Sequence, residues 1–346
     1  MEPATAAPSE ASSELREVGK PTMTAAVCHA YGSPDVLELQ EIEKPEPADD
    51  EVLVRVRAAS INPVDWYGMA GRPYVGRVTM GVLKPKSDRL GVDFAGTVEA
   101  VGRDVAHVRP GDDVFGARNG ALAEYVCVRE ERAIVPKPAS LTFEEAAAVP
   151  VAALTALQGL RDKGRLEAGQ HVLINGASGG VGTFAVQIAK ALGAEVTGVC
   201  STGKVELVRS LGPDHVVDYT REDFTRSGRR YDLMLDVAGS RSWRECTRVL
   251  SPQATLVVAG APKGGLLLGP LSHVVRLRVA SVGSSRTVVF FVAQMNKADL
   301  DVLRELLESG KVTPVVDRRY ELSEVAEAFR YLEEGHARGK IVVSVP

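Results

Sequence analysis

The chain has 346 residues, 45% of them hydrophobic and 25% charged, with a formal net charge of −4. This length exceeds what one ordinary core holds and favours two domains of roughly 150 residues each. The slightly negative charge provides no basic field for nucleic acid, and no stretch approaches the roughly 20 apolar residues of a membrane span, so neither partner is expected. The four cysteines, Cys28, Cys127, Cys200 and Cys246, lie far apart and indicate neither a disulfide framework nor a cysteine-rich metal site.

The first segment, residues 1–22, is rich in Ala, Ser, Pro and Glu and contains no apolar run. This composition predicts a disordered tail. The tail lacks the apolar core of a secretory signal, and its acidic residues argue against an organelle transit peptide. We therefore predict a cytoplasmic protein.

Residues 23–142 form the first predicted domain. Short segments of strand character are separated there by Gly, Pro and Asp, and they read TAAVCHA, EVLVRVRAAS, GTVEAVG, DDVFGA and AEYVCV. Such spacing predicts an all-β, barrel-like domain.

The pattern changes at Thr142, which is placed to cap a helix that carries Glu144 and Glu145 in its first turn. Residues 143–285 then alternate strand and helix, with the last strand predicted over RVASVGS, residues 278–284. This alternation predicts an α/β fold with a doubly wound parallel sheet. Residues 286–346 return to mixed helix and strand.

The turn from Gly176 to Gly182 joins an apolar strand to an amphipathic helix. Gly179 and Gly180 let the backbone approach a pyrophosphate, and Gly182 lets the helix pack on the strand. Ala177 replaces the first glycine of the usual spacing. The turn predicts a dinucleotide site; the alternative is a tight turn in a domain that has lost its ligand.

The end of the second strand of this domain indicates which dinucleotide binds. An Asp or Glu would bond the ribose diol of NAD there, but the chain has Cys200, Ser201 and Thr202, with Lys204 close behind. These residues offer hydroxyl donors and a cation to a 2′-phosphate, so NADPH is the predicted cofactor. In the alternative interpretation, Ser201 caps the next helix and Lys204 is a solvated surface charge.

The chain from residue 23 onward resembles the medium-chain dehydrogenase/reductase superfamily, and within it the quinone oxidoreductase, or zeta-crystallin-like, branch. The residues that carry the resemblance are GASGGVGTFAVQ, INPVDW, GVDFAG, PGDDVFG and GHARGKIVV. They look most similar to the reticulon-interacting and chloroplast-envelope quinone reductase relatives. The resemblance implies a GroES-like catalytic domain at residues 23–142, a Rossmann NADP-binding domain at 143–285, and a return to the catalytic domain at 286–346.

The resemblance also implies a zinc-free enzyme. Where zinc-dependent relatives place a ligand Cys, this chain has Asn62, and where they place Gly-His-Glu it has Gly91, Val92 and Asp93. Without a Lewis acid, plain alcohol oxidation is disfavoured. Quinones and α,β-unsaturated carbonyl compounds, which are already electrophilic, are the implied acceptors.

Residues carried over from the family fall into three cofactor groups. Those expected at the pyrophosphate are Ser178, Gly179, Gly180, Val181 and Gly182; at the adenosine 2′-phosphate, Ser201, Lys204, Tyr219, His336 and Arg338; and at the nicotinamide, Gly239 and Gly260. The alternatives are a strand-end aromatic for Tyr219, a cation after a helix for His336, and turn glycines for Gly239 and Gly260.

Asn62 and Tyr67 are the catalytic candidates. Asn62 could hydrogen-bond the nicotinamide or the acceptor oxygen, and Tyr67 could orient the acceptor or donate a proton. The alternatives are a turn residue before Pro63 and a half-buried aromatic. Asp65 and Asp93 are expected to make buried hydrogen bonds to the backbone rather than to catalyse.

These residues together predict an NADPH-dependent reductase of quinones or enones. The alternatives are a trans-2-enoyl thioester reductase and a non-enzymatic NADPH-binding interaction protein. Family analogy also implies a homodimer, with residues 279–283 and 288–292 as candidate elements of the interface or of the nicotinamide side of the site.

Overall fold

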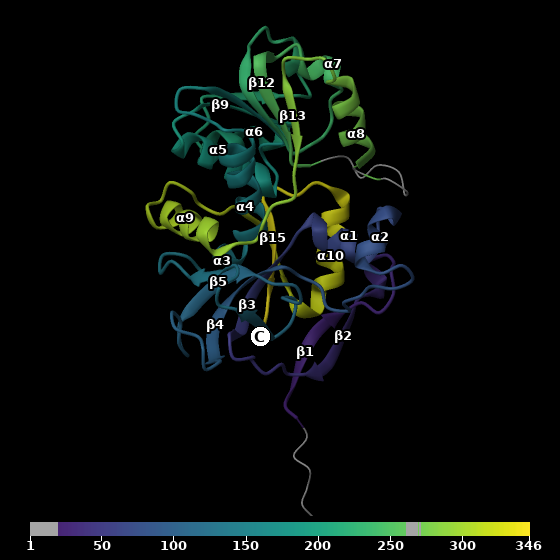
Figure 1. Ribbon diagram of the computed structural model, residues 1–346, viewed down its shortest axis with the longest axis vertical. Helices are drawn as coiled ribbons and strands as arrows, with labels where there is room; N and C mark the ends of the chain where they lie inside the picture. The colour runs from purple at the N-terminus through teal and green to yellow at the C-terminus, as the bar shows by residue number, and fades with distance from the viewer. Residues whose placement is uncertain (1–19, 261–268, 270) are drawn as a thin grey trace, which may run out of the picture.

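The computed structural model describes residues 20–260, 269 and 271–346, and its two large β-sheets lie one above the other in Figure 1. The predicted tail at residues 1–22 lies outside the described residues except for its last three. The first strand, β1, begins at Thr22 and pairs antiparallel with β2 (Glu38–Glu43) in a small separate sheet.

The lower sheet has seven strands in the order β14-β15-β3-β4-β5-β7, with β6 also paired to β3. Their bounds are β3 (Glu51–Ile61), β4 (Asp93–Val101), β5 (Asp113–Ala117), β6 (Tyr125–Arg129), β7 (Ile134–Pro136), β14 (Val316–Glu321) and β15 (Lys340–Ser344). The last strand of the chain, β15, pairs antiparallel with β3. The C-terminal part of the chain therefore completes the sheet that the N-terminal part begins.

The expectation that this region is all-β was wrong, because two helices interrupt it: α1 (Pro63–Ala70) and the short α2 (Arg77–Met80). Local signals for α1 were present. Pro63 occupies its first turn, and Gly71 ends it in the left-handed conformation with φ of 59°. At eight residues, α1 is too short for an apolar period to stand out.

The upper sheet is parallel throughout, in the order β10-β9-β8-β11-β12-β13. Its strands are β8 (His171–Asn175), β9 (Glu195–Cys200), β10 (His215–Asp218), β11 (Tyr231–Asp236), β12 (Leu250–Val258) and β13 (Thr287–Phe290). The strand order reverses at β8, which is the signature of a doubly wound sheet. The predicted α/β fold with a Rossmann-type sheet is confirmed.

The chain between β12 and β13 departs from the prediction. Residues 278–284 were expected to form a strand, but helix α8 (Leu271–Ala280) extends into that segment. The β-branched Val279 and Val282 suggested a strand, yet both side chains are exposed rather than paired. The strand that follows, β13, belongs to the upper sheet, so the boundary predicted at residue 285 falls one strand too early.

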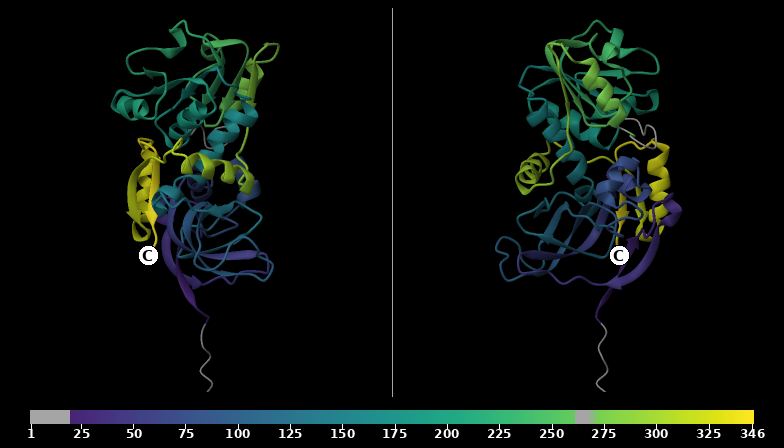
Figure 2. Two further views of the ribbon diagram at one scale, coloured as in Figure 1. Left: turned by 90° about the vertical axis from the view of Figure 1, so that its left-hand side faces the viewer. Right: turned by 45° about the vertical axis from the view of Figure 1, so that its right-hand side comes forward.

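The remaining helices cover the upper sheet, lie between the two sheets or, as residues 143–147 and 325–334 do, pack against the lower sheet (Figures 1 and 2). They are α3 (Phe143–Ala147), α4 (Pro150–Gln158), α5 (Gly180–Ala191), α6 (Val205–Ser210), α7 (Trp243–Cys246), α9 (Lys297–Glu308) and α10 (Val325–Glu334). Thr142 caps α3 as predicted, since its side chain accepts a hydrogen bond from the Glu145 amide. No helix in the described part of the chain is both long and apolar enough to span a bilayer.

One apolar core runs through both sheets. It includes Ala58 and Ala95 of the lower sheet, Leu154 of α4, and Val172 and Ile174 of the upper sheet, all fully buried. Because a continuous core joins them, the two sheets pack as one body around the region where the site residues meet.

Candidate functional site

The glycine-rich turn has the geometry of a phosphate cradle. Strand β8 ends at Asn175, Gly176 takes a left-handed φ of 92°, and α5 begins at Gly180. A Cβ added at Gly182 would lie 2.1 Å from the Gly176 carbonyl oxygen, so only glycine permits this close packing. The first amides of α5 have no acceptor within the helix and are available to an anion.

A cavity of about 460 Å³ opens beside this turn, at the carboxyl ends of the strands where the strand order reverses. Five predicted cofactor residues line it: Ser178, Gly179, Ser201, Lys204 and Tyr219. Three segments distant in sequence therefore meet at one cavity, as the dinucleotide prediction requires.

Two cations, Lys204 and Arg338, lie near each other, and Lys204 lines this cavity. The Lys204 ammonium donates to the Ala337 carbonyl at 3.0 Å, and an added Cβ at Gly203 would lie 4.0 Å from the Arg338 guanidinium. Burial and then the Arg338 charge lower the pKa of Lys204, and Asp317 offsets part of this effect. Neither cation forms an ion pair within the described residues. An anion at this position would relieve the repulsion between them.

Ser201 and Tyr219 lie beside these cations. Ser201 occupies the cap position of the short η4 helix (Thr202–Lys204), but its side chain makes no capping bond. Tyr219 is 52% exposed. Both side chains are therefore accessible to a ligand in the cavity.

The other predicted cofactor residues have different surroundings. Val181 lies in the first turn of α5, and His336 is exposed. The Gly239 amide donates to Asp236 Oδ1 at 2.8 Å. A Cβ at Gly260 would lie 1.9 Å from the Val237 carbonyl oxygen, so backbone packing alone accounts for that glycine. None of these four residues lines the cavity beside the turn.

A buried polar cluster lies on the lower-sheet side of the site. The Lys340 ammonium donates to Asn62 Oδ1 at 2.5 Å and lies 3.3 Å from Asp93 Oδ2. The same Asp93 oxygen accepts the Asn62 side-chain amide and the Ser60 hydroxyl, each at 2.8 Å, while Oδ1 accepts the Val151 amide at 2.9 Å. Each polar side chain in this cluster thus has a partner, as burial requires.

Lys340 links the cluster to the glycine-rich turn. Gly339 forms a parallel bridge with Gly179, and an added Cβ at Gly180 would lie 3.1 Å from Lys340 Cδ. Lys340 itself is 3% exposed. In the sequence this lysine stands out only as part of the GHARGKIVV motif, where a charged residue opens an apolar strand.

Asp65 and Asp93 make buried hydrogen bonds to the backbone, as expected. The Asn62 amide donates to Asp65 Oδ2 at 2.8 Å. Burial raises the pKa of Asp65 to about 7, and the nearby Asp93 charge adds to the increase against the opposing effect of that hydrogen bond. Asp65 is thus partly protonated near neutral pH.

Tyr67 follows on the same helix and is half-buried, with its ring packed edge-on against Trp66 at 5.2 Å between centroids. Burial raises the pKa of Tyr67, so it stays a neutral hydroxyl donor. Trp66 donates to Glu333 of α10 at 2.7 Å and so fixes α1 against the C-terminal helix. Neither Asn62 nor Tyr67 lines the cavity beside the glycine turn.

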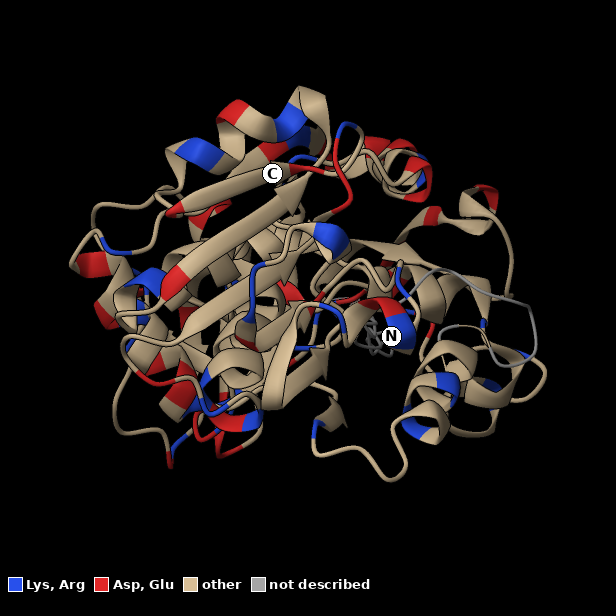
Figure 3. Cartoon of the chain, turned by 90° about the horizontal axis from the view of Figure 1, so that it is seen from above, with Lys and Arg blue, Asp and Glu red and all other residues tan. Residues whose placement is uncertain are grey.

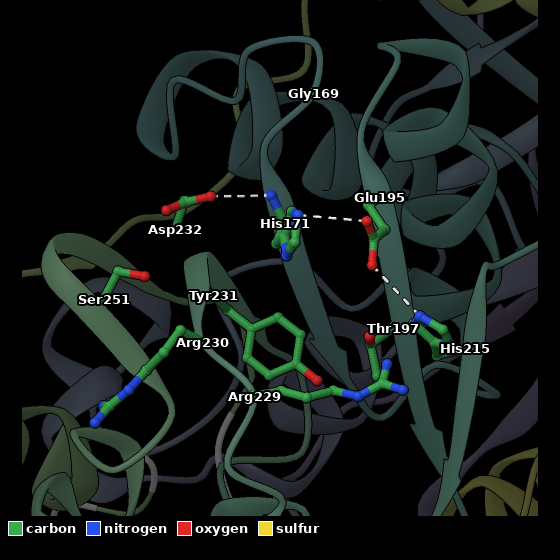
Figure 4. Close-up of a pocket in the computed structure, with 10 residues that line it drawn as sticks. All are labelled: Gly169, His171, Glu195, Thr197, His215, Arg229, Arg230, Tyr231, Asp232 and Ser251. Atoms are coloured by element: carbon green, nitrogen blue, oxygen red, sulfur yellow. Dashed lines mark hydrogen bonds and ion pairs between the residues drawn. The ribbon is translucent and has the colours of Figure 1, made fainter.

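A different cavity, of about 500 Å³, lies at the amino ends of the upper strands (Figure 4). Glu195 lies there between His171 and His215, 3.3 Å from each ring nitrogen. Register explains this arrangement, because His171 opposes Glu195 and His215 opposes Thr197 on adjacent strands. Ligands of doubly wound sheets bind at the carboxyl ends, so this cavity is not the cofactor site.

In the part of the chain that the structure describes, the buried cluster around Lys340 does not bring three metal-ligating side chains together. Among the described residues, only His107, Glu130 and Glu131 place metal-ligating atoms close together. The Glu130 carboxylate accepts hydrogen bonds from the backbone amides of residues 106–108. These bonds, which hold the loop in place, account for the position of Glu130. Acidic and basic residues are interspersed over the face in Figure 3.

Comparison with known proteins gives two family matches. Residues 48–139 match the alcohol dehydrogenase GroES-like domain, and residues 211–343 match the zinc-binding dehydrogenase family. The mouse mitochondrial NAD(P)H oxidoreductase RTN4IP1 is 37% identical, covering 93% of this chain and 89% of the mouse protein. The chloroplastic NADPH-dependent alkenal/one oxidoreductase of Arabidopsis thaliana is 36% identical, covering 93% and 79%.

The solved structures agree with these relatives. The quinone oxidoreductase from Coxiella burnetii superposes with a TM-score of 0.81 at 31% identity, covering 94% of this chain and all of that one. The mouse relative is named as mitochondrial and the Arabidopsis relative as chloroplastic, so the cytoplasmic location stays a prediction from the sequence.

The raised pKa of Asp65 predicts a specific pH dependence of stability. The folded chain holds this proton up to about pH 7, whereas the ordinary pKa of an Asp carboxyl is 3.8, so stability falls as pH rises between these values. From pH 5.5 to pH 8 the loss is about 2 kcal/mol. Urea unfolding at both values should show Asp65→Asn losing less stability than wild type over this range. Equal losses in the two proteins would contradict the buried, protonated state.

Proposed function

Because the chain belongs to the quinone oxidoreductase branch of the medium-chain dehydrogenase/reductase superfamily, we propose that it uses NADPH to reduce quinones or α,β-unsaturated carbonyl compounds without a metal ion. Its relatives place it among the NAD(P)H-dependent oxidoreductases of the quinone and alkenal reductase group. The observation that carries the finer proposal is the buried ammonium of Lys340 between Asn62 and Asp93.

The donor chemistry of this cluster does not suit zinc. Asn62 and Asp93 stand where the family resemblance places zinc ligands, yet an amide and one carboxylate are a weaker donor set than Cys and His. The Lys340 ammonium already occupies the oxygen atoms of both residues. A divalent cation there would have to displace a buried positive charge, so the acceptor must be electrophilic without Lewis-acid help.

NADPH fits the cavity beside the glycine turn. The free amides at the start of α5 would hold the pyrophosphate, and Ser201, Lys204 and Arg338 would hold the 2′-phosphate. Bound NADPH supplies the hydride. The two converging cations support NADPH over NADH, because NADH brings no phosphate to separate their charges.

The chain's own residues would position and protonate the acceptor. The Asn62 side chain donates one of its two amide hydrogens to Asp93, and Lys340 fixes its orientation by donating to its oxygen. The second amide hydrogen would then bond the oxygen of the acceptor or of the nicotinamide carboxamide. After hydride reaches the acceptor, Tyr67 or solvent would donate the proton that completes reduction. The raised pKa of Tyr67 keeps its proton available.

We also propose that two chains associate through the edge of the upper sheet. Strand β13 ends the sheet order, and no strand in the described part of the chain pairs with its outer edge. Apolar side chains are exposed beside it, with Val282 at 83% and Val292 at 79%. Pairing of two β13 strands about a twofold axis would cover both the edge and these side chains.

The paired cations predict how cofactor preference changes on mutation. Arg338→Ala and Lys204→Ala should each weaken NADPH binding tenfold or more, because a charge-assisted phosphate contact contributes about 1.5–3 kcal/mol. Affinity for NADH should change little. Titration of both cofactors by protein fluorescence checks this, with the exposed Lys311→Ala as a matched control. Equal losses for NADPH and NADH would place the 2′-phosphate elsewhere.

The proposed reaction is tested by NADPH consumption across a panel of quinones, enones and enoyl thioesters. Turnover with quinones or enones is expected, and it should survive a zinc chelator. Tyr67→Phe should lower kcat by roughly tenfold to a hundredfold while NADPH affinity stays unchanged. Preference for enoyl thioesters would identify a thioester reductase, and tight NADPH binding with no turnover would identify a binding protein. Chelator-sensitive turnover with one zinc per chain would overturn the metal-free proposal.

The assembly is checked by light scattering coupled to size-exclusion chromatography. Wild type should elute with the mass of two chains, and the Val282→Asp/Val292→Asp variant with the mass of one, because buried unpaired charges oppose association. Val302→Asp, on the outer face of α9, serves as control. A monomeric wild type would rule out the interface, and so would a variant that remains dimeric.

A further inference from the structure

A second cavity, of about 470 Å³, adjoins the cofactor cavity. It lies between α7 and α8, which are neighbours at one side of the upper sheet in Figure 1. The two cavities share Ser240 and Arg241 in the loop after β11. Neither the glycine turn nor the buried Lys340 cluster contributes to its lining.

Three arginines line this cavity, Arg241, Arg244 and Arg276, together with His273. No carboxylate is among its described lining residues, although Arg241 also lies near Asp223 and Glu245 behind the lining. Arg244 and Arg276 are exposed at the rim and form no ion pair within the described residues. The Arg276 guanidinium contacts only its own helix, at Ser272. In a chain of net charge −4, such a local excess of cations is a specific feature rather than a general property of the surface.

Two buried nitrogen atoms in the cavity have no hydrogen-bond partner: Arg241 Nε and His273 Nε2. Arg241 is held in place on other sides, with Phe224 5.0 Å from its guanidinium, Glu245 at 3.4 Å and Asp223 at 3.7 Å. Its Nε–H is therefore fixed in direction without an acceptor. A buried donor is rarely left unpaired in a native protein, so the Arg241 Nε–H indicates a missing acceptor.

We propose that this cavity binds a phosphate or diphosphate ester of a second ligand, distinct from the dinucleotide. Guanidinium groups match phosphate oxygens with paired hydrogen bonds, and the volume accommodates more than one phosphate. The dinucleotide already has its own anion contacts at the start of α5 and at Lys204. The shared wall at Arg241 places the second ligand beside the bound cofactor. Its source is either the phosphorylated tail of an acceptor or a separate phosphate-bearing molecule.

Calorimetry with inorganic pyrophosphate tests the site in the full-length protein, with saturating NADP⁺ present to fill the cofactor cavity. Wild type should bind one pyrophosphate. Arg244→Ala/Arg276→Ala should weaken this binding at least tenfold and leave NADP⁺ affinity unchanged, because both side chains lie outside the cofactor cavity. Arg248→Ala/Lys311→Ala removes the same charge from exposed positions elsewhere and should bind as wild type. Absence of pyrophosphate binding, or equal binding in the two double variants, would overturn the proposal.

A kinetic arm identifies the source of the phosphate, and only this arm rests on the proposed reductase activity. It compares crotonyl-coenzyme A with crotonyl-pantetheine, which lacks phosphate. A KM raised tenfold for the first compound alone in Arg244→Ala/Arg276→Ala would assign the cavity to an acceptor tail. An unchanged KM for both, with pyrophosphate binding lost, would assign it to a separate ligand. A KM raised for both alike would count against the site. If no acceptor turns over, the reductase proposal fails while the calorimetric result stands.

Discussion

The buried ammonium of Lys340 is the contact on which the site depends. It reaches Asn62 before α1 and Asp93 at the start of β4, and Asp93 in turn binds the backbone of α4 through Val151. One charged pair thus joins three separate parts of the chain. A buried charge that loses its partner typically costs 3–5 kcal/mol, so these parts are held in a single arrangement.

The two sheets contribute different chemistry to the same region. The upper sheet supplies backbone amides at the start of α5 and the cations around Lys204, which suit phosphate. The lower sheet supplies the Asn62 amide and the neutral hydroxyl of Tyr67, which suit a carbonyl oxygen. The apolar core that continues from one sheet to the other joins the parts of the chain that carry these two sets of groups. This division suits a reaction in which one set of groups holds the cofactor and the other set orients the acceptor.

Features encoded by adjacent residues could be predicted from the sequence. The Gly176–Gly182 turn and the Thr142 cap are local, since each depends on backbone geometry over a few residues. Lys340 could not be assigned, because its partner Asp93 is 247 residues away and no spacing rule connects them. The segment at 278–284 was misread because Val279 at the end of α8 and Val282 in the turn after it, both exposed, imitate the β-branched content of a strand. Arg241 was missed for the same reason as Lys340, since its role arises only where α7 meets α8.

The bridge between Gly179 and Gly339 links the turn to the last strand of the described chain. The glycine turn and the residue that contacts it are thus 160 positions apart in the chain. Residues 339 and 340 belong to one short segment, which contacts the turn through Gly339 and the Asn62–Asp93 pair through Lys340. A substitution that shifts this segment would therefore disturb the turn and the buried polar cluster together.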